Sequence, residues 1–323
     1  MKKWDIKNNF KFQISNFKLD KFTKILLENR GLKTKKEIDA FLNPRLENVT
    51  VDSVDIDKKQ LAKVLKRIEK SIKDKEQIVV FGDYDVDGIC GTAILWETLH
   101  NLGARVMPYI PHRVDEGYGL SKKGISNVKS EMPDVKLIIT VDNGIVASEA
   151  VEYAKKKGID VIITDHHVPS KKLPKAYAIV HTTKLCGTGV AYLLSKVLRH
   201  IPRNEDDEHL ELVALATIAD LVPLREANRV LTKYGLSALA KTKRLGLLEL
   251  FKEAALDASV IGVYHVGHII APRLNAMGRM EYAMGSLRLL CTKSSDRAVK
   301  LAWKLGQTNR ERQMLTKDSF LQA

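Results

Sequence analysis

The spacing of hydrophobic positions changes along the chain, and that change predicts where helices and strands lie. Residues 1–75 carry apolar residues at helical spacing, most clearly over 57–75. Gly31 marks a helix end, Thr34 a restart, and the pair Asn43 and Pro44 a break. The sequence therefore predicts a helical N-terminal lead-in over residues 1–75.

From residue 76 to 225 the rhythm is different, because short apolar runs alternate with helical patterns. The runs are rich in β-branched residues and span 77–81, 105–110, 136–141, 160–164 and 176–180. Strands that are apolar throughout and separated by helices are typical of a parallel sheet covered on both faces. We therefore expect an α/β fold with a doubly wound parallel sheet in this segment.

The remainder of the chain favours helices. A helical connector is expected over 226–263, and residues 296–323 have a helical pattern that ends without a capping glycine or a polar tail. The stretch "VYHVGHIIAPRLNAMGRM" over 263–280 follows no simple period. The abrupt end suggests that the natural protein is longer than this chain.

Composition indicates an ordinary globular protein. Hydrophobic residues make up 45% and charged residues 28% of the chain. It contains no apolar run long enough for a membrane span and no secretory signal pattern. The three cysteines, Cys90, Cys186 and Cys291, are far apart and odd in number, which favours reduced thiols and a cytoplasmic location.

The net charge of +14 is concentrated at the two ends of the chain. Lys and Arg exceed Asp and Glu by 9 over residues 1–75 and by 6 over 264–323, whereas the centre has a balance of −1. This distribution suits a catalytic centre whose flanks hold a polyanion. Surface lysines that are merely solvated would give the same pattern, so charge alone leaves both interpretations open.

The stretch "GDYDVDG" places Asp83, Asp85 and Asp87 on alternate residues before Gly88. This spacing resembles the start of an EF-hand calcium loop, but position twelve of that loop would be Ile94 instead of glutamate. A predicted strand also precedes the motif where an EF-hand has a helix. The calcium-loop interpretation therefore fails.

Two further predicted strands end in residues that bind metals. Asp142 follows the run at 136–141, and Asp165, His166 and His167 follow the run at 160–164. Parallel strands bring their carboxyl ends to one edge of the sheet, so these groups can meet the aspartates of the first motif. Carboxylates with imidazoles and no thiolates suit Mn²⁺ or Mg²⁺, and their number suggests two ions that catalyse phosphoester hydrolysis.

The motifs "GDYDVDG", "TVDNG" and "TDHH", in this order, resemble those of the DHH phosphoesterases. The segments "LLENRGLKTKKEIDAFLNP", "YIPHRVDEGYGLS", "GTGVAYLLS", "LATIADLVPL" and "PRLNAMGR" are similar to those of the single-stranded-DNA-specific exonucleases of that superfamily. The resemblance implies a DHH catalytic domain over 76–225. It also implies that 264–323 is the start of a second, α/β DHH-associated domain that is truncated here.

The resemblance also implies roles for particular residues. Two divalent ions would be bound, and the reaction catalysed, by Asp85, Asp87, Asp142, His166 and Asp220, with His167 and Asp83 in or next to the ligand shell. The strand would be contacted near the metals by Arg113 and Tyr118, and its phosphates by Arg273, Asn275 and Arg279.

The chain departs from the family pattern at two informative positions. Phe81 stands where many DHH phosphoesterases have a histidine ligand, so Asp83 or water would substitute for it. His181 lies in "AIVHTTKL", where the family commonly has Asn-Pro and a longer loop. The sequence gives no role for His181.

Three functions remain as alternatives. The leading one is an exonuclease that degrades single-stranded DNA from the 5′ end in repair and recombination, as a monomer, with a helicase and a single-strand-binding protein as further partners. The second is a phosphodiesterase or phosphatase for short oligonucleotides or small nucleotides. The third is a nucleic-acid-binding protein without activity, which the nearly complete ligand set disfavours.

Overall fold

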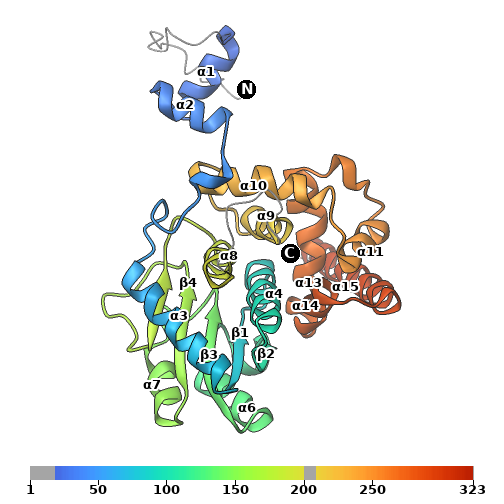
Figure 1. The fold of residues 1–323 in the computed structure, drawn as a ribbon. Helices are drawn as coiled ribbons and strands as arrows, with labels where there is room; N and C mark the ends of the chain where they lie inside the picture. The colour runs from blue at the N-terminus through green and yellow to red at the C-terminus, as the bar shows by residue number, and fades with distance from the viewer. Residues whose placement is uncertain (1–18, 200–208, 323) are drawn as a thin grey trace.

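The computed structural model describes residues 19–199 and 209–322 and is built around a five-stranded parallel sheet (Figure 1). The strand order is β2-β1-β3-β4-β5. The strands are β1 (Gln77–Phe81), β2 (Val106–Tyr109), β3 (Val135–Val141), β4 (Asp160–Asp165) and β5 (Ala178–His181). The predicted α/β fold with a parallel sheet is confirmed.

The order of the strands creates a switch point between β1 and β3. The chain moves outward from β1 to β2 and then returns to the other side of β1 as β3. Phe81 pairs with Thr140, Val141 with Thr164, and Asp165 with His181, so the carboxyl ends are level. Ligands of open α/β sheets bind at such a switch point, outside the carboxyl ends of the strands.

Helices cover both faces of the sheet, as expected for a doubly wound fold (Figure 1). One face packs against α3 (Lys58–Lys73), α4 (Val86–Asn101) and α8 (Gly187–Leu198). The other packs against α6 (Lys122–Glu131) and α7 (Ser148–Lys156). Side chains alternate along β1, so Ile78 and Val80 enter the first core and Val79 and Phe81 the second.

The N-terminal lead-in contains two short helices that stand apart from the body (Figure 1). Helix α1 (Lys21–Asn29) and helix α2 (Lys35–Leu42) bury Leu27 and Ile38 against each other. Thr34 and Glu37 form a capping box that starts α2, which agrees with the predicted restart. A 3₁₀ turn at Leu46–Asn48 then leads toward α3, and residues 1–18 lie outside the described part.

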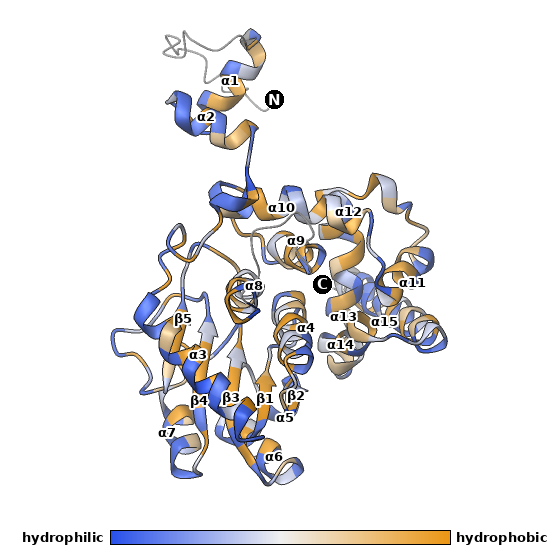
Figure 2. Ribbon diagram, viewed as in Figure 1, coloured by the Kyte–Doolittle hydropathy of each residue, from blue (hydrophilic) through white to orange (hydrophobic). Residues whose placement is uncertain are grey.

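Helices alone follow β5 in the described residues. After α8 they are α9 (Leu210–Ala219), α10 (Glu226–Leu239), α11 (Leu245–Glu253), a 3₁₀ turn (Ala258–Val260), α12 (Val263–His265), a π turn labelled η3 (Val266–Ile270), α13 (Ala271–Met280), α14 (Met284–Cys291) and α15 (Ser295–Gln322). Their apolar sides join the core beside α4, as the orange inner faces in Figure 2 indicate. Residues 209–322 therefore contribute no strand to the expected second α/β domain, because their apolar positions recur at helical spacing.

The irregular stretch over 263–280 is one continuous helix with an unusual middle. Helix α12 runs through η3 into α13. A π turn closes i→i+5 hydrogen bonds and inserts an extra residue, so the hydrophobic period shifts within the helix. This shift explains why the sequence showed no single period. We call residues 263–280 the composite helix.

Among the residues that the structure describes, no helix is both long enough and apolar enough to span a membrane.

Candidate metal centre and nucleic-acid interface

The loop after β1 turns sharply into α4 and carries the first three aspartates. Asp85 caps the helix, because its side chain accepts a hydrogen bond from the Gly88 N–H at 3.0 Å. A Cβ at Gly88 would lie 2.5 to 2.6 Å from the backbone and Cβ of Asp83, so only glycine fits there. Asp83 and Asp87 are buried as a result of this tight turn.

The loop after β3 presents Asp142 in a strained conformation. Asp142 has a φ of +64°, in the left-handed region that non-glycine residues rarely adopt. Asn143 holds the turn, because its side-chain amide donates to the carbonyls of Val141 and Phe81 and accepts from the Leu120 N–H. Asn143 therefore has a structural role in joining β1 and β3 that its Asp-Asn-Gly turn motif did not reveal.

The loop after β4 is organised by Asp165. Its carboxylate accepts hydrogen bonds from the backbone N–H groups of Ile145, His166 and His167 and lies 2.8 Å from His167 Nδ1. Burial opposes its ionisation, but these hydrogen bonds lower the pKa of Asp165 below its usual value. Asp165 thus positions the two histidines, whereas the sequence suggested it only as one of the metal-binding residue types at the end of this strand.

The start of α8 holds Asp87. The backbone N–H groups of Gly187 and Thr188 donate to the two Asp87 carboxylate oxygens, each at 2.7 Å. A Cβ at Gly187 would lie 2.6 Å from the Asp142 Cβ, so glycine is required where α8 approaches the β3 loop. In the sequence, the glycine-containing segment "CGTG" marks this contact, but its role beside Asp87 and Asp142 was not predicted.

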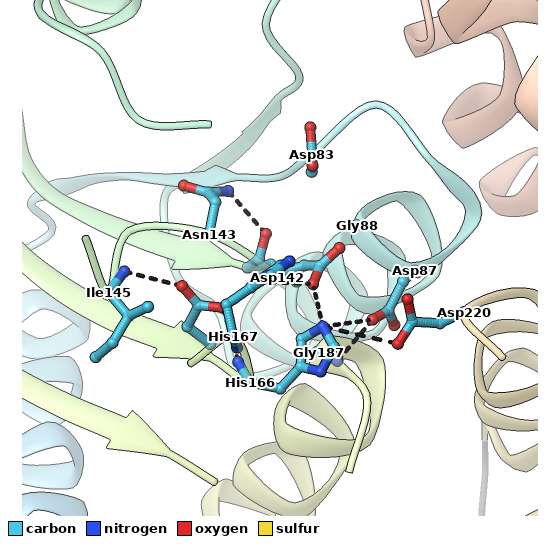
Figure 3. Close-up of polar contacts among 12 residues, drawn as sticks. Asp83, Asp87, Gly88, Asp142, Asn143, Ile145, His166, His167, Gly187 and Asp220 are labelled. Carbon is cyan, nitrogen blue, oxygen red and sulfur yellow. Dashed lines mark hydrogen bonds and ion pairs between the residues drawn. The ribbon is translucent and has the colours of Figure 1, made fainter. Parts of the chain in front are cut away.

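These elements bring the predicted metal-binding and catalytic residues together: Asp83, Asp85, Asp87, Asp142, His166, His167 and Asp220. Figure 3 labels all of them except Asp85. His166 Nε2 lies 3.1 Å from Asp142 Oδ1 and 3.7 Å from both Asp87 Oδ2 and Asp220 Oδ2. Asp220 reaches the site as the C-cap of α9. Three groups have ligand atoms within 4.8 Å of one another: Asp83, Asp85 and Asp142; Asp87, His166 and Asp220; and Asp142, His166 and His167.

The crowded carboxylates disturb one another's ionisation. Burial and the Asp85 charge raise the pKa of Asp83 to about 7, and burial with the charges of Asp87 and Asp85 raises the pKa of Asp220 to about 7. Burial and the Asp87 charge raise the pKa of Asp142 well above its usual value. Such an array of buried like charges is typical of a site that a cation neutralises.

The donor atoms fit hard or intermediate divalent ions. Asp83 Oδ2 is buried and accepts no hydrogen bond, although such an atom normally has a partner. Asp142 Oδ1 is also buried and lies 3.1 Å from His166 Nε2. Burial lowers the pKa of His166, which favours the neutral imidazole that binds metals. Carboxylate oxygens with one or two imidazoles suit Mn²⁺ and Mg²⁺, and no cysteine is among the three groups.

Phe81 and His181, the two departures from the family pattern, have clear structural roles. The Phe81 ring is buried and stacks on Tyr109 at a centroid distance of 5.2 Å, on the sheet face that α6 covers. Its side chain therefore belongs to the core. His181 Nε2 lies 2.7 Å from the backbone carbonyl of His167, so His181 supports the loop that carries the histidine pair.

Aromatic and basic side chains flank the centre on one side. The Arg113 guanidinium lies 5.1 Å from the Tyr84 ring, in a cation–π arrangement. Tyr118 contacts Tyr84 edge to face, and its hydroxyl is 3.2 Å from His167 Nε2. Arg113 and Tyr118 are both exposed, so the structure brings these two predicted strand contacts to the surface next to the metal centre.

The three predicted phosphate contacts on α13 differ in their surroundings. Asn275 Oδ1 accepts a hydrogen bond from the Val86 N–H, at the start of α4. Arg279 is exposed and follows Gly278, which packs against the Tyr84 carbonyl. Arg273 instead donates to Glu253 at 2.7 Å and to the Ile269 carbonyl, so a phosphate would compete with an existing ion pair there.

Residues 77–217 match the model of the DHH family, N-terminal domain. The single-stranded-DNA-specific exonuclease RecJ of Bacillus subtilis is 40% identical over 301 residues, which cover 90% of this chain and 37% of that protein. RecJ of Escherichia coli is 33% identical over 322 residues, covering 92% of this chain and 54% of that protein. The chain thus spans about a third to a half of the length of these curated relatives.

Solved structures agree with these sequence matches. RecJ from Thermus thermophilus in complex with Mn²⁺ has a TM-score of 0.77 and 32% identity, covering 93% of this chain and 43% of that one. A second structure, exonuclease RecJ bound to manganese, has a TM-score of 0.74 and 35% identity, covering 81% of this chain and 69% of that one.

Proposed function

Because the chain belongs to the DHH family and is a relative of the RecJ exonucleases, we propose that it hydrolyses phosphodiester bonds of single-stranded DNA. The observation that carries this proposal is the convergence of Asp87, Asp142, His166 and Asp220, from four separate segments, within one partly buried cluster. We further propose digestion from the 5′ end, in repair and recombination.

The residues of the cluster would hold two divalent ions, Mn²⁺ or Mg²⁺. One ion would bind the group of Asp83, Asp85 and Asp142, and the other would bind Asp87, His166 and Asp220. When bound, such ions polarise the phosphate and lower the pKa of the attacking water. Asp142 belongs to the first group, and its Oδ1 lies 3.1 Å from Nε2 of His166 in the second, so Asp142 is the residue through which both positions would be coupled.

The surrounding residues would bind the strand. Arg113 and Arg279 are exposed and carry the guanidinium groups suited to phosphate oxygens. The exposed ring of Tyr118 would contact a base or sugar next to the metal centre. We propose a cytoplasmic monomer that works with a helicase and a single-strand-binding protein.

A time course with 5′- and 3′-labelled oligonucleotides in Mn²⁺ tests the proposal. The expected result is loss of mononucleotides from the 5′ end of single strands, with little loss from duplex. Asp142→Ala should be inactive, whereas Asp115→Ala, an exposed carboxylate on α5 (Arg113–Glu116), should retain activity.

Activity that survives exhaustive chelation, or an active Asp142→Ala, would contradict the metal-dependent mechanism. Faster cleavage of dinucleotides than of long strands would instead favour the small-nucleotide alternative.

A further inference from the structure

The composite helix begins with an exposed pair of aromatic rings, Tyr264 and His268. Their centroids are 4.6 Å apart, with an angle of 15° between the planes, so the rings are stacked. His268 Nδ1 lies 3.3 Å from the Tyr264 carbonyl, which restricts the imidazole. Tyr264 remains 65% exposed, and a second ring, that of His265, touches it only edge-on.

The pair lies on an element that contacts sequence neighbours of the candidate metal ligands at two points. Next to His268, a Cβ at Gly267 would lie 3.8 Å from Ile218, which is two residues before the candidate ligand Asp220. Seven residues beyond His268, Asn275 accepts a hydrogen bond from the Val86 N–H in the first turn of α4. At 1.5 Å per residue, this separation is about 10 Å along the helix, the length of one or two nucleotides.

The orientation of the helix leaves the pair open to solvent. Val266, Ile270 and Leu274 are buried and fix the side of the helix that faces the core. The stacked rings of Tyr264 and His268 offer a flat apolar surface to solvent. Neither ring is needed to pack the core. The segment 264–323 carries 10 Lys and Arg against 4 Asp and Glu, so its surface charge favours a polyanionic partner.

We propose that Tyr264 and His268 form a stacking platform for one nucleobase of a single strand whose phosphates occupy the metal centre. The proposal rests on the proposed function and adds a base contact on the Asp220 side of the cluster. Aromatic rings stack on any base because every base has a π face, so the platform would bind strands without sequence preference. Because the rings are already stacked, binding would order few additional side-chain torsions.

The test is fluorescence anisotropy with a 5′-labelled twelve-residue oligothymidylate in Ca²⁺, with the intact oligonucleotide confirmed on a gel. Tyr264→Ala should weaken binding about tenfold, the size expected for one base–aromatic stack. Tyr264→Phe keeps the ring and should stay within about twofold of the wild type. A series of oligonucleotides with one abasic site at successive positions then locates the stacked base.

The abasic series gives the decisive comparison. At one position the abasic site should weaken binding by the wild type but not by Tyr264→Ala, because the base and the ring form one interaction. Equal affinities of the wild type and Tyr264→Ala for the intact oligonucleotide would overturn the proposal. An abasic site that weakens binding by Tyr264→Ala as much as binding by the wild type would also overturn it. A wild type that binds no oligonucleotide would also overturn it.

Hydrolysis of bis(p-nitrophenyl) phosphate in Mn²⁺ separates this proposal from the proposed function. This substrate has no nucleobase, so Tyr264→Ala should hydrolyse it at the wild-type rate. If the wild type hydrolyses it and the affinities are equal, the platform fails and the proposed function stands. If the abasic coupling appears without hydrolysis of either substrate, the platform stands and the proposed function fails.

Discussion

Asn275 Oδ1 accepts a hydrogen bond at 2.9 Å from the Val86 N–H, across 189 residues of sequence. This bond joins α13 to the first turn of α4, next to Asp85 and Asp87. Asn275→Ala would leave an N–H of that turn without an acceptor, and we expect the free energy of unfolding to fall by about 1–2 kcal/mol. Chemical denaturation followed by circular dichroism measures this change.

The matched control is Arg279→Ala, four residues along the same helix. Arg279 is exposed, so its replacement should change stability by less than about 0.5 kcal/mol while it weakens oligonucleotide binding. Equal stability of the two variants would contradict the structural role of Asn275.

Gly187→Ala should disrupt the metal centre without removing any ligand. The added Cβ would lie 2.6 Å from the Asp142 Cβ and 2.7 Å from its Oδ1, so either α8 or the Asp142 loop has to move. We expect Mn²⁺ affinity measured by calorimetry to fall by about tenfold or more. Gly262→Ala, where a Cβ would meet nothing within 4 Å, should bind Mn²⁺ like the wild type.

Phe81→His should not create a metal ligand, although the family resemblance led us to expect a histidine ligand at this position. The side chain points into the core against Tyr109, so an imidazole there would bury polar nitrogens without partners. We expect a loss of about 2–4 kcal/mol in stability and no gain in Mn²⁺ affinity. Phe81→Leu, which stays apolar, should cost less. Tighter Mn²⁺ binding by Phe81→His would show that the side chain can reach the site.

The contribution of Asp83 and Asp220 to the stability of the metal-free chain should fall as pH rises. Asp83 and Asp220 have folded pKa values of about 7, above their ordinary value of 3.8, so the folded chain binds more protons than the unfolded chain between these limits. The two carboxyl groups therefore contribute their full stabilisation to the free energy of unfolding below about pH 4. This stabilisation is lost as the pH rises toward 7 and above. Thermal melts in EDTA from pH 5 to pH 8 measure this trend.

Mn²⁺ should reverse the trend, because it replaces the protons that the cluster loses. Asp83→Asn and Asp220→Asn, which cannot ionise, should flatten the pH dependence without metal. An unchanged slope in both variants would mean that other groups cause it.

Local patterns predicted the sheet because each strand is a continuous apolar run, and the strand ends then indicated Asp142 and the Asp165–His167 triplet. Asp220 gave no such signal, since it ends a helix whose position depends on packing, and only the family resemblance identified it. The hydrogen bonds of Asn143 and Gly187 and the Arg273–Glu253 pair join distant segments, so no local pattern encodes them. The π turn was hidden because it changes the very period by which helices are recognised.

That turn also fixes an angular relationship. In an uninterrupted α-helix each residue advances by about 100°, so one extra residue rotates everything before it relative to everything after it. Val266–Ile270 therefore set the direction of Tyr264 relative to that of Asn275, which faces the start of α4. The orientation of the Tyr264–His268 pair toward the metal centre thus depends on the number of residues in Val266–Ile270. Inserting or deleting one residue there would turn the pair in another direction, although both rings would still be present.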